Sequence, residues 1–456
     1  MKILKNFIFL IDFVIITLMN LTINKTHNKK RKKELRNDIS YIHIMKYMGS
    51  KRELLPDIKK SIYEMIPHNS TILDLFSGTA SVGAYLKKDF NIISNDIQEY
   101  SEVIAKALII SSEISLDEEI HLIIHNIEKK YLENKDKLIS LFQKSYTESN
   151  VFVDIKKNEW TETERLKYIK FLNIFPSPSN EFKSTSAELN LLFTKYKNKD
   201  IDPYLQTVFL FSETYFSLEQ TMDIDSIRYA IDEVIKDEPL KSIFLSALIY
   251  AFSYCSSGTG HFAMFRDLKD LSSVEDTFIY RKKRVWKYFI NKLDQLIEYH
   301  EYIPTKKHKI YSNDFSNLLN SDKIKNVDLI YADPPYSSVH YSRFYHAIES
   351  LVKYDYDMPA FKGRYRSDRH QSPFCQKTNV YNAFKMLFRC AHTNNSHVLL
   401  SYSDSGLISL SEITDIITDA GFKNKVYKIE YDHSTLGRKG HKNNTINEYL
   451  IQASLN

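Results

Sequence analysis

Short apolar segments separated by a turn and a helix are the feature that most restricts how this chain can fold. Residues 71–76 and 91–94 have the composition of two buried strands. A glycine-containing turn at residues 77–83 and a helical segment at residues 84–88 lie between them. A strand, a turn, a helix and a second strand in this order are typical of the start of a parallel α/β sheet.

Apolar segments of the same kind return near the end of the chain, at residues 308–311, 327–331, 397–402, 425–431 and 448–453. From about residue 101 to residue 306, long charged segments of helical character dominate. The sequence therefore predicts an α/β fold, with one sheet built from both ends of the chain around a large, mainly helical insert. The predicted parts are a leader or appended extension (1–44), the first part of the sheet domain (45–110), the insert (111–306) and the second part (307–456).

The first 44 residues are unlike the rest. Residues 7–21 are apolar but contain Asp12, and they are shorter than the ~20 residues that a spanning helix needs. We interpret this segment as a leader ahead of a start near Met45, with a membrane anchor as the alternative, and expect no membrane partner. Residues 1–40 hold nine Lys and Arg against three Asp and Glu, so the remaining chain is close to neutral although the net charge is +5. Any surface that binds nucleic acid must then be a local patch.

Three cysteines, Cys255, Cys375 and Cys390, lie far apart in the sequence. They form neither a zinc-binding spacing nor a disulfide framework, so we expect a cytoplasmic protein without a metal.

The tetrapeptide Asp333-Pro334-Pro335-Tyr336 follows directly after the predicted strand 327–331. Ligands of open α/β sheets bind at this end of the strands. The Asp333 carboxylate and the Pro334 carbonyl suit the activation of a base amine, which is a poor nucleophile, and the prolines fix the direction of these acceptors. Tyr336 can stack on a base flipped out of a duplex. The alternative is a proline-rich turn that ends a strand.

Two further motifs suggest a ligand site. In residues 74–83, small residues allow a nucleoside to approach the backbone, and Asp96 is placed for ribose hydroxyls. Any nucleotide-binding unit or a simple tight turn would also fit, although the spacing is not that of a nicotinamide site. Before the first strand, residues 46–52 contain a glycine turn and Lys51, which can hold a small carboxylate or simply start a helix.

With these motifs in this order, the chain resembles the adenine-specific DNA methyltransferases typified by the bacterial Dam enzymes. The resemblance implies a Rossmann-like sheet that binds S-adenosylmethionine, with Asp333, Pro334, Pro335 and Tyr336 as the catalytic group. It implies a cofactor site made by Tyr47, Gly49, Lys51, Asp74, Phe76, Gly78, Asp96 and Asp314. Within that site, Gly49 and Lys51 are expected at the methionine end, Asp96 at the ribose and Asp314 near the cofactor adenine. One departure is Ala80, where many relatives have a second loop glycine; a negative φ would accommodate it.

The resemblance further implies methylation of a flipped adenine in double-stranded DNA, within a restriction-modification system that can include a companion restriction endonuclease. Candidate phosphate contacts are Arg343, Arg364, Arg366 and Arg369, and a second basic run lies at residues 281–284. A solvated face is the alternative for both runs. Alternatives for the function are methylation of the cytosine amine and a non-catalytic DNA-binding subunit. Methylation of the cytosine ring carbon is disfavoured because no Pro-Cys nucleophile accompanies the motif.

Overall fold

The computed structural model describes residues 42–110, 119–176, 182–258, 260–300, 307–336, 341–360, 365–431 and 446–455. The chain divides into two compact units, Met1–His43 and Ile44–Asn456, and the second contains all the elements below. The apolar stretch at residues 7–21 and Arg364 lie outside the described residues. Within the described ranges, no helix is long and apolar enough to span a membrane.

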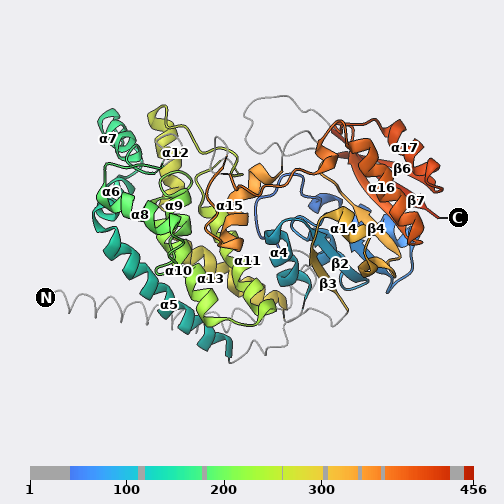
Figure 1. The fold of residues 1–456 in the computed structure, drawn as a ribbon, viewed down its shortest axis with the longest axis horizontal. Helices are drawn as coiled ribbons and strands as arrows, with labels where there is room; N and C mark the ends of the chain where they lie inside the picture. The colour runs from blue at the N-terminus through green and yellow to red at the C-terminus, as the bar shows by residue number, and fades with distance from the viewer. Residues whose placement is uncertain are drawn as a thin grey trace. The chain divides into compact units, whose positions relative to one another are not determined.

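A seven-stranded sheet is built from strands near both ends of the second unit. The strand order is β3-β2-β1-β4-β5-β7-β6 (Figure 1). Its strands are β1 Thr71–Asp74, β2 Asn91–Asp96, β3 Lys309–Ser312, β4 Leu329–Ala332, β5 His397–Ser403, β6 Lys423–Tyr431 and β7 Ile446–Ser454. The first five strands in sequence are parallel, whereas β7 runs antiparallel to both β5 and β6. Every strand predicted from the sequence is present, so the α/β, Rossmann-like fold is confirmed.

The order of the strands reverses at the pairing of β1 with β4. From β1 the sheet extends to β2 and β3 on one side, and from β4 it extends to β5 on the other. In the register of this pair, Leu73 lies opposite Ile330 and Asp74 opposite Tyr331. The carboxyl ends of β1 and β4 are therefore adjacent at the switch point of the sheet, where open α/β sheets bind ligands.

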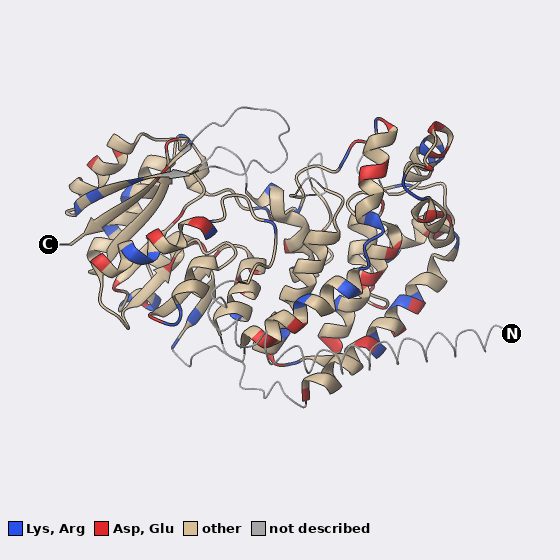
Figure 2. Ribbon diagram, turned by 180° about the vertical axis from the view of Figure 1, so that it is seen from behind, with Lys and Arg blue, Asp and Glu red and all other residues tan. Residues whose placement is uncertain are grey.

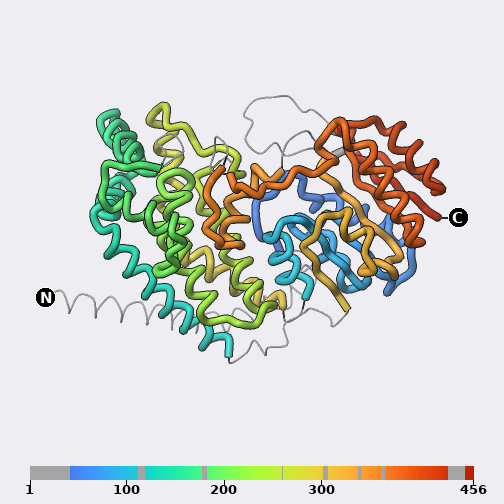
Figure 3. The backbone as a smooth tube through the Cα atoms, in the orientation of Figure 1, coloured from blue at the N-terminus to red at the C-terminus, as the bar shows by residue number. Residues whose placement is uncertain are grey.

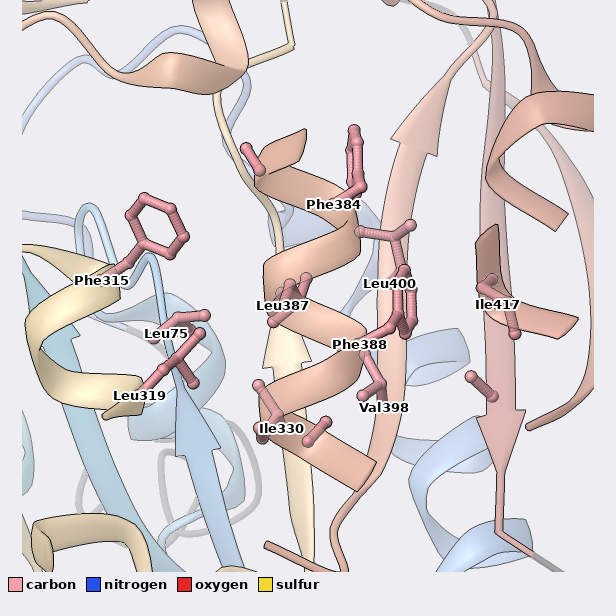
Figure 4. Close-up of a cluster of buried hydrophobic side chains, with 14 of the residues drawn as sticks. Leu75, Phe315, Leu319, Ile330, Phe384, Leu387, Phe388, Val398, Leu400 and Ile417 are labelled. Atoms are coloured by element: carbon pink, nitrogen blue, oxygen red, sulfur yellow. The ribbon is translucent and has the colours of Figure 1, made fainter. Parts of the chain in front are cut away.

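Apolar side chains on alternate strand positions bury one face of the sheet. Leu73, Ile330, Val398 and Leu400 point to this face and pack against α14 (Phe315–Leu319), α16 (Val380–Thr393) and α17 (Leu410–Asp419) (Figure 4). The alternation follows from the two-residue period of a strand. The remaining helices of the sheet domain are α2 (Leu55–Met65), α3 (Ser81–Leu86) and α4 (Glu99–Ile109): α2 contacts β5 and β7, while α3 and α4 contact β2.

The predicted insert is helical throughout its described elements. These are α5 Glu119–Leu141, α6 Gln143–Asp154, α7 Glu162–Leu172, α8 Ala187–Lys197, α9 Gln206–Phe211, α10 Leu218–Val234, α11 Glu238–Cys255, α12 Leu271–Arg281 and α13 Val285–His300. One element from beyond the predicted boundary joins them. Helix α15 (Ser342–Lys353) follows β4 in sequence but lies among the insert helices (Figure 3). The Gln206 amide donates to the Ser350 carbonyl, and Arg228 donates to the carbonyls of Leu351 and Val352.

A buried ion pair joins α12 to the loop before α10. Arg281 Nη1 lies 2.6 Å from Glu213 Oε2, and both side chains are only 2% exposed. The hydroxyls of Ser149 and Tyr168 also donate to Glu213, at 2.7 and 2.6 Å. The expectation that Arg281 contributes to a phosphate-binding basic run is therefore wrong, because its guanidinium is enclosed in the protein.

Removal of one partner should leave the other charge buried and uncompensated. We expect Glu213→Ala to lower the free energy of unfolding by about 3–5 kcal/mol, measured by urea denaturation. The control is Lys325→Ala, which removes a pair with Asp322 whose side chains are 65% and 87% exposed, and which should cost less than about 1 kcal/mol. Equal effects of the two substitutions would contradict the structural role of Glu213.

Candidate active site

A cavity opens where the carboxyl ends of β1, β2 and β4 meet. Its empty volume, including the solvent at its open mouth, is about 1300 Å³. All the predicted cofactor and catalytic positions line it, namely Tyr47, Gly49, Lys51, Asp74, Phe76, Gly78, Asp96, Asp314, Asp333, Pro334, Pro335 and Tyr336. The structure thus brings together residues that are up to 289 positions apart in sequence, Tyr47 and Tyr336 being the extremes.

The loop after β1 uses two left-handed residues. Gly78 has φ +51°, and a Cβ at this position would lie 2.9 Å from the Tyr47 hydroxyl oxygen. Ala80 has φ +54°, so the negative φ that would accommodate an alanine without strain is not the one that the loop adopts. The reason is the tight turn into α3, in which the Ala80 N–H donates to the Ser77 carbonyl at 2.7 Å. A left-handed alanine costs about 1–2 kcal/mol, which the surrounding buried contacts must offset.

Asp96 connects the end of β2 to this loop. Its Oδ2 accepts the Gly78 N–H at 2.9 Å, and its Oδ1 accepts the Gln98 N–H at 3.0 Å. Burial raises the pKa of Asp96, although these backbone donors counteract the shift. Each carboxylate oxygen can accept a second hydrogen bond, so Asp96 can bind ligand hydroxyls while it holds the loop.

Asp74, at the end of β1, is buried without compensation. Among the described residues, neither of its carboxylate oxygens has a hydrogen-bond partner of normal geometry. Burial, reinforced by the carboxylates of Asp333 and Asp96, raises the pKa of Asp74 to about 8. A buried carboxyl group in this situation fits a ligand that supplies a cation or N–H donors.

Lys51 joins the catalytic motif to the last part of the sheet. Its Nζ lies 3.2 Å from Asp333 Oδ1 and 3.2 Å from Glu448 Oε2 on β7. Burial disfavours the ammonium, but the nearby Asp333, Tyr336 and Glu448 outweigh it and hold the pKa of Lys51 well above its usual value. Burial raises the pKa of Asp333 to about 6, against the opposing effect of Lys51. The Lys51 ammonium is thus engaged by two carboxylates, and its expected contact with the methionine end of a cofactor stays a prediction.

Glu448 is the site residue that the sequence analysis missed. Its Oε1 accepts the Tyr336 hydroxyl at 3.1 Å, so the residue holds both Lys51 and Tyr336. Its side chain is only 2% exposed. The available signal was a lone acidic residue at the start of an apolar strand, before Leu450, Ile451 and Ala453.

Two tyrosines of the segment after the motif hold the glycine turn at residues 46–52. The Met48 N–H donates to the Tyr345 hydroxyl at 2.7 Å, and the Tyr341 hydroxyl donates to the Met48 carbonyl at 3.1 Å. Gly49 has φ +76°, and a Cβ there would lie 2.9 Å from the Tyr341 hydroxyl oxygen. A glycine is required on both counts.

The cavity wall also includes a segment to which no sequence motif pointed, around Ser372 and Cys375. The Cys375 thiol donates to the Pro335 carbonyl at 3.4 Å. Phe374 packs edge-on against Phe76, with ring centroids 5.5 Å apart. Asp314, on the same side, caps α14 by accepting the Ser316 N–H at 2.9 Å.

The predicted DNA-contacting arginines have different surroundings. Arg366 is buried, and its guanidinium donates to the carboxylates of Asp355 and Asp368. Because its donors are satisfied within the protein, the structure contradicts a phosphate contact for Arg366. The guanidinium groups of Arg343 and Arg369 lie over the Tyr365 ring, 5.4 and 5.7 Å from its centroid, and their contact with DNA stays a prediction.

A parallel sheet with acidic strand ends and an Asp-Pro-Pro-Tyr motif around one cavity defines a Rossmann-like methyltransferase. Residues 47–416 match the model of the D12 class N6 adenine-specific DNA methyltransferases. The chain belongs to this family, and the resemblance inferred from its motifs is confirmed.

Similar proteins include the Type II methyltransferase M.FokI of Planomicrobium okeanokoites, 27% identical over 85% of this chain and 49% of that protein. The modification methylase LlaI of Lactococcus lactis subsp. lactis is 25% identical over 82% of this chain and 48% of its own length. The Type II methyltransferase M.NlaIII of Neisseria lactamica is 32% identical over 31% of this chain and 42% of its own length. The chain spans about half the length of the first two relatives.

The surroundings of Asp74 predict a pH-dependent stability. An acid whose pKa is raised by folding binds more protons in the folded state, here between about pH 4 and about pH 8, so stability falls as the pH rises through this window. Asp74→Asn removes this loss. The free energy of unfolding of Asp74→Asn minus that of the wild type, measured in urea titrations, should be larger at pH 8 than at pH 5 by more than about 1 kcal/mol. Parallel pH dependences of the two proteins would contradict the raised pKa of Asp74.

Proposed function

We propose that this protein transfers a methyl group from S-adenosylmethionine to the exocyclic amine of adenine in double-stranded DNA. The observation that carries the proposal is the position of Asp333 at the end of β4, where it lines the same cavity as Asp74 and Asp96. Membership of the adenine-specific family supports the choice of base.

The residues of the cavity fit the cofactor. The unpartnered Asp74 carboxyl group suits a cationic part of S-adenosylmethionine, and Asp96 suits the ribose hydroxyls. Phe76 suits the methionine moiety and Asp314 the adenine ring, and both line the same cavity. When bound, the cofactor supplies an electrophilic methyl group on a sulfonium.

Asp333 and its neighbours act on the target base. Lys51 holds Asp333 through Oδ1, which orients the carboxylate so that Oδ2 can accept an N–H of the adenine amine. The Pro334 carbonyl accepts the other N–H, and Tyr336, held through its hydroxyl by Glu448, offers a ring face for stacking. The bound cofactor would supply the methyl group that the amine nitrogen accepts, and Asp333 would take up the proton that the nitrogen loses and pass it to water.

The organisation of the chain suggests how the DNA is recognised. The helical insert at residues 111–306, with α15 packed among its helices, would read the target sequence beside the sheet domain. Because the relatives are named modification methylases and Type II methyltransferases, we assign the protein to a restriction-modification system with a companion restriction endonuclease.

Expression of the full chain in a host free of DNA methylation tests the function directly. Long-read sequencing of the host DNA should detect N6-methyladenine at one recurring motif. Modification restricted to cytosine amines would overturn the choice of base. A folded protein that binds the cofactor but modifies no DNA would support a non-catalytic DNA-binding subunit instead.

Two substitutions separate catalysis from cofactor binding. Asp333→Ala should lower the rate of methyl transfer by about 100-fold or more, because Asp333 acts on the base amine, and should leave cofactor affinity within a few-fold. Asp96→Ala should instead weaken cofactor binding, measured by isothermal titration calorimetry. Full activity of Asp333→Ala, or unchanged affinity of Asp96→Ala, would remove the respective assignment.

The pKa of Asp333 sets an acid limit to the activity. Because only the carboxylate accepts the amine hydrogen, the rate of transfer should fall as the pH drops below about 6. Lys51 lowers the pKa of Asp333 and Glu448 raises it, so Glu448→Gln should move the acid limb of the pH–rate profile to lower pH, and Lys51→Met should move it to higher pH. Shifts in the same direction would contradict the opposing roles of the two residues.

A further inference from the structure

One aromatic ring at the C-terminal end of α12 is surrounded by positive charge. Three cations lie within 6 Å of the centroid of the Tyr280 ring: Lys283 Nζ at 4.4 Å, Arg266 Cζ at 5.5 Å and Lys46 Nζ at 5.7 Å. They come from the turn before α2, the loop before α12 and the turn after it. We refer to Lys46, Arg266 and Lys283 as the cation cluster.

The backbone that carries the cluster is fixed by buried contacts. The Gln220 side-chain amide donates to the carbonyls of Tyr280 and Lys283, both at 2.9 Å, which fixes the turn after α12. The Lys46 N–H donates to the Ser253 hydroxyl at 3.3 Å. The cations therefore converge because the fold places their backbone there, not because long side chains happen to meet on a surface.

Protein carboxylates balance the cluster only in part. Arg266 pairs with Asp276 at 3.3 Å, and the Asp276 side chain is 56% exposed. In the described part of the chain, no carboxylate forms an ion pair with Lys46 or Lys283. Burial lowers the pKa of Lys46, and the charges of Lys283 and Arg266 lower it further. The contacts that Lys283 does make, with the Tyr254 carbonyl at 2.6 Å and the tyrosine rings, stabilise a cation without neutralising it.

The cluster differs in this respect from the other basic runs. Arg281 and Arg366 are buried against Glu213, Asp355 and Asp368. Over the molecule as a whole, both signs of charge are distributed along the helices and strands (Figure 2). This cluster brings three cations on half-buried side chains together with one partly exposed carboxylate, and an external anion would relieve the excess of positive charge.

The cluster also borders the active site. Lys46 directly precedes Tyr47, which lines the cavity. Arg266 follows the loop that contains Phe262, whose N–H donates at 2.8 Å to the carbonyl of Phe344 on α15. Helix α15 begins next to Tyr341, another residue of the cavity wall. A duplex that presents a base to the cavity therefore has its backbone within reach of these side chains.

We propose that Lys46, Arg266 and Lys283 bind the phosphate backbone of duplex DNA next to the flipped base. The inference rests on the proposed function, because it takes the substrate to be DNA. Phosphate contacts of this kind set the position of the protein on the duplex and contribute to affinity without reading the sequence. Tyr280 supports the cations and does not contact the bases.

The salt dependence of DNA binding tests this proposal with the full chain. Each neutralised phosphate releases counterions, so the slope of log affinity against log salt concentration decreases in magnitude by about 0.9 for each phosphate that a variant no longer neutralises. Arg266→Gln and Lys283→Gln should each reduce the slope by about this amount, and the double variant by about twice as much. The probe is a fluorescent duplex that contains adenine, titrated by anisotropy over a range of KCl concentrations on both sides of physiological ionic strength.

Matched controls separate the cluster from general charge effects. Lys269→Gln, in the same loop region as Arg266, changes a lysine that is 76% exposed, and Lys287→Gln changes an exposed lysine four residues after Lys283. Both should leave the slope unchanged. Arg266→Lys should restore most of the slope, since it keeps the charge, and thermal unfolding by circular dichroism verifies that each variant is folded.

The outcomes distinguish a failure of the phosphate contacts from a failure of the proposed function. Wild-type slopes in the Arg266→Gln and Lys283→Gln variants, with DNA methylation intact, would overturn the phosphate contacts and leave the proposed function in place. A wild-type protein that binds duplex DNA at no salt concentration would overturn the proposed function. Slopes reduced equally by the cluster and control variants would also overturn the inference, because the effect would then be one of total charge.

Discussion

The active site depends on one buried ammonium held between two carboxylates. Lys51 contacts Asp333 at the end of β4 and Glu448 on β7, and these three residues come from segments far apart in the sequence. A buried charge is tolerated only when it is paired and hydrogen-bonded. The turn at residues 46–52, strand β4 and strand β7 are consequently fixed to one another at the point where, in the proposed function, the base amine would be oriented. Stability and catalytic geometry have the same origin here.

The parallel strands bring several carboxyl groups close together, and the Lys51 ammonium compensates part of their negative charge. Because neighbouring strands end at the same edge, the carboxyl groups of Asp74, Asp96 and Asp333 converge on one cavity. The protein compensates Asp333 with Lys51 and Asp96 with the N–H groups of Gly78 and Gln98. Among the described residues, it leaves Asp74 without a donor of normal geometry. The uncompensated Asp74 carboxyl group therefore lies where a cationic cofactor would supply positive charge.

The sequence predicted the parts of the site that depend on local order and failed where distant contacts decide. Strand periodicity was sufficient for the sheet, and the motifs with the family resemblance were sufficient for the predicted part of the cavity lining, but not for its wall around Ser372 and Cys375. Glu448 was missed because its role depends on a distant contact. The antiparallel pairing of β7 with β5 brings Glu448 to Lys51, which no local pattern in the sequence indicates. Ala80 was recognised as a departure from the family loop, but its left-handed φ was not predicted, because the turn into α3 imposes it. The role of Arg366 was wrong because Asp355 and Asp368 enclose it, and no linear spacing distinguishes an enclosed arginine from an exposed one.

The difference between enclosed and exposed cations also affects which side chains are available for the proposed binding of DNA. Runs of basic residues were the natural candidates, yet the buried guanidinium groups of Arg281 and Arg366 pair with carboxylates of the protein itself. The cations of the proposed phosphate site, of which Arg266 alone pairs with a carboxylate among the described residues, come from three separate segments and meet around the Tyr280 ring. Since the chain beyond its first 40 residues is close to neutral, attraction to a polyanion must be concentrated in such places. The proposed phosphate contacts would orient a duplex relative to the cavity, which a uniform positive charge would not do.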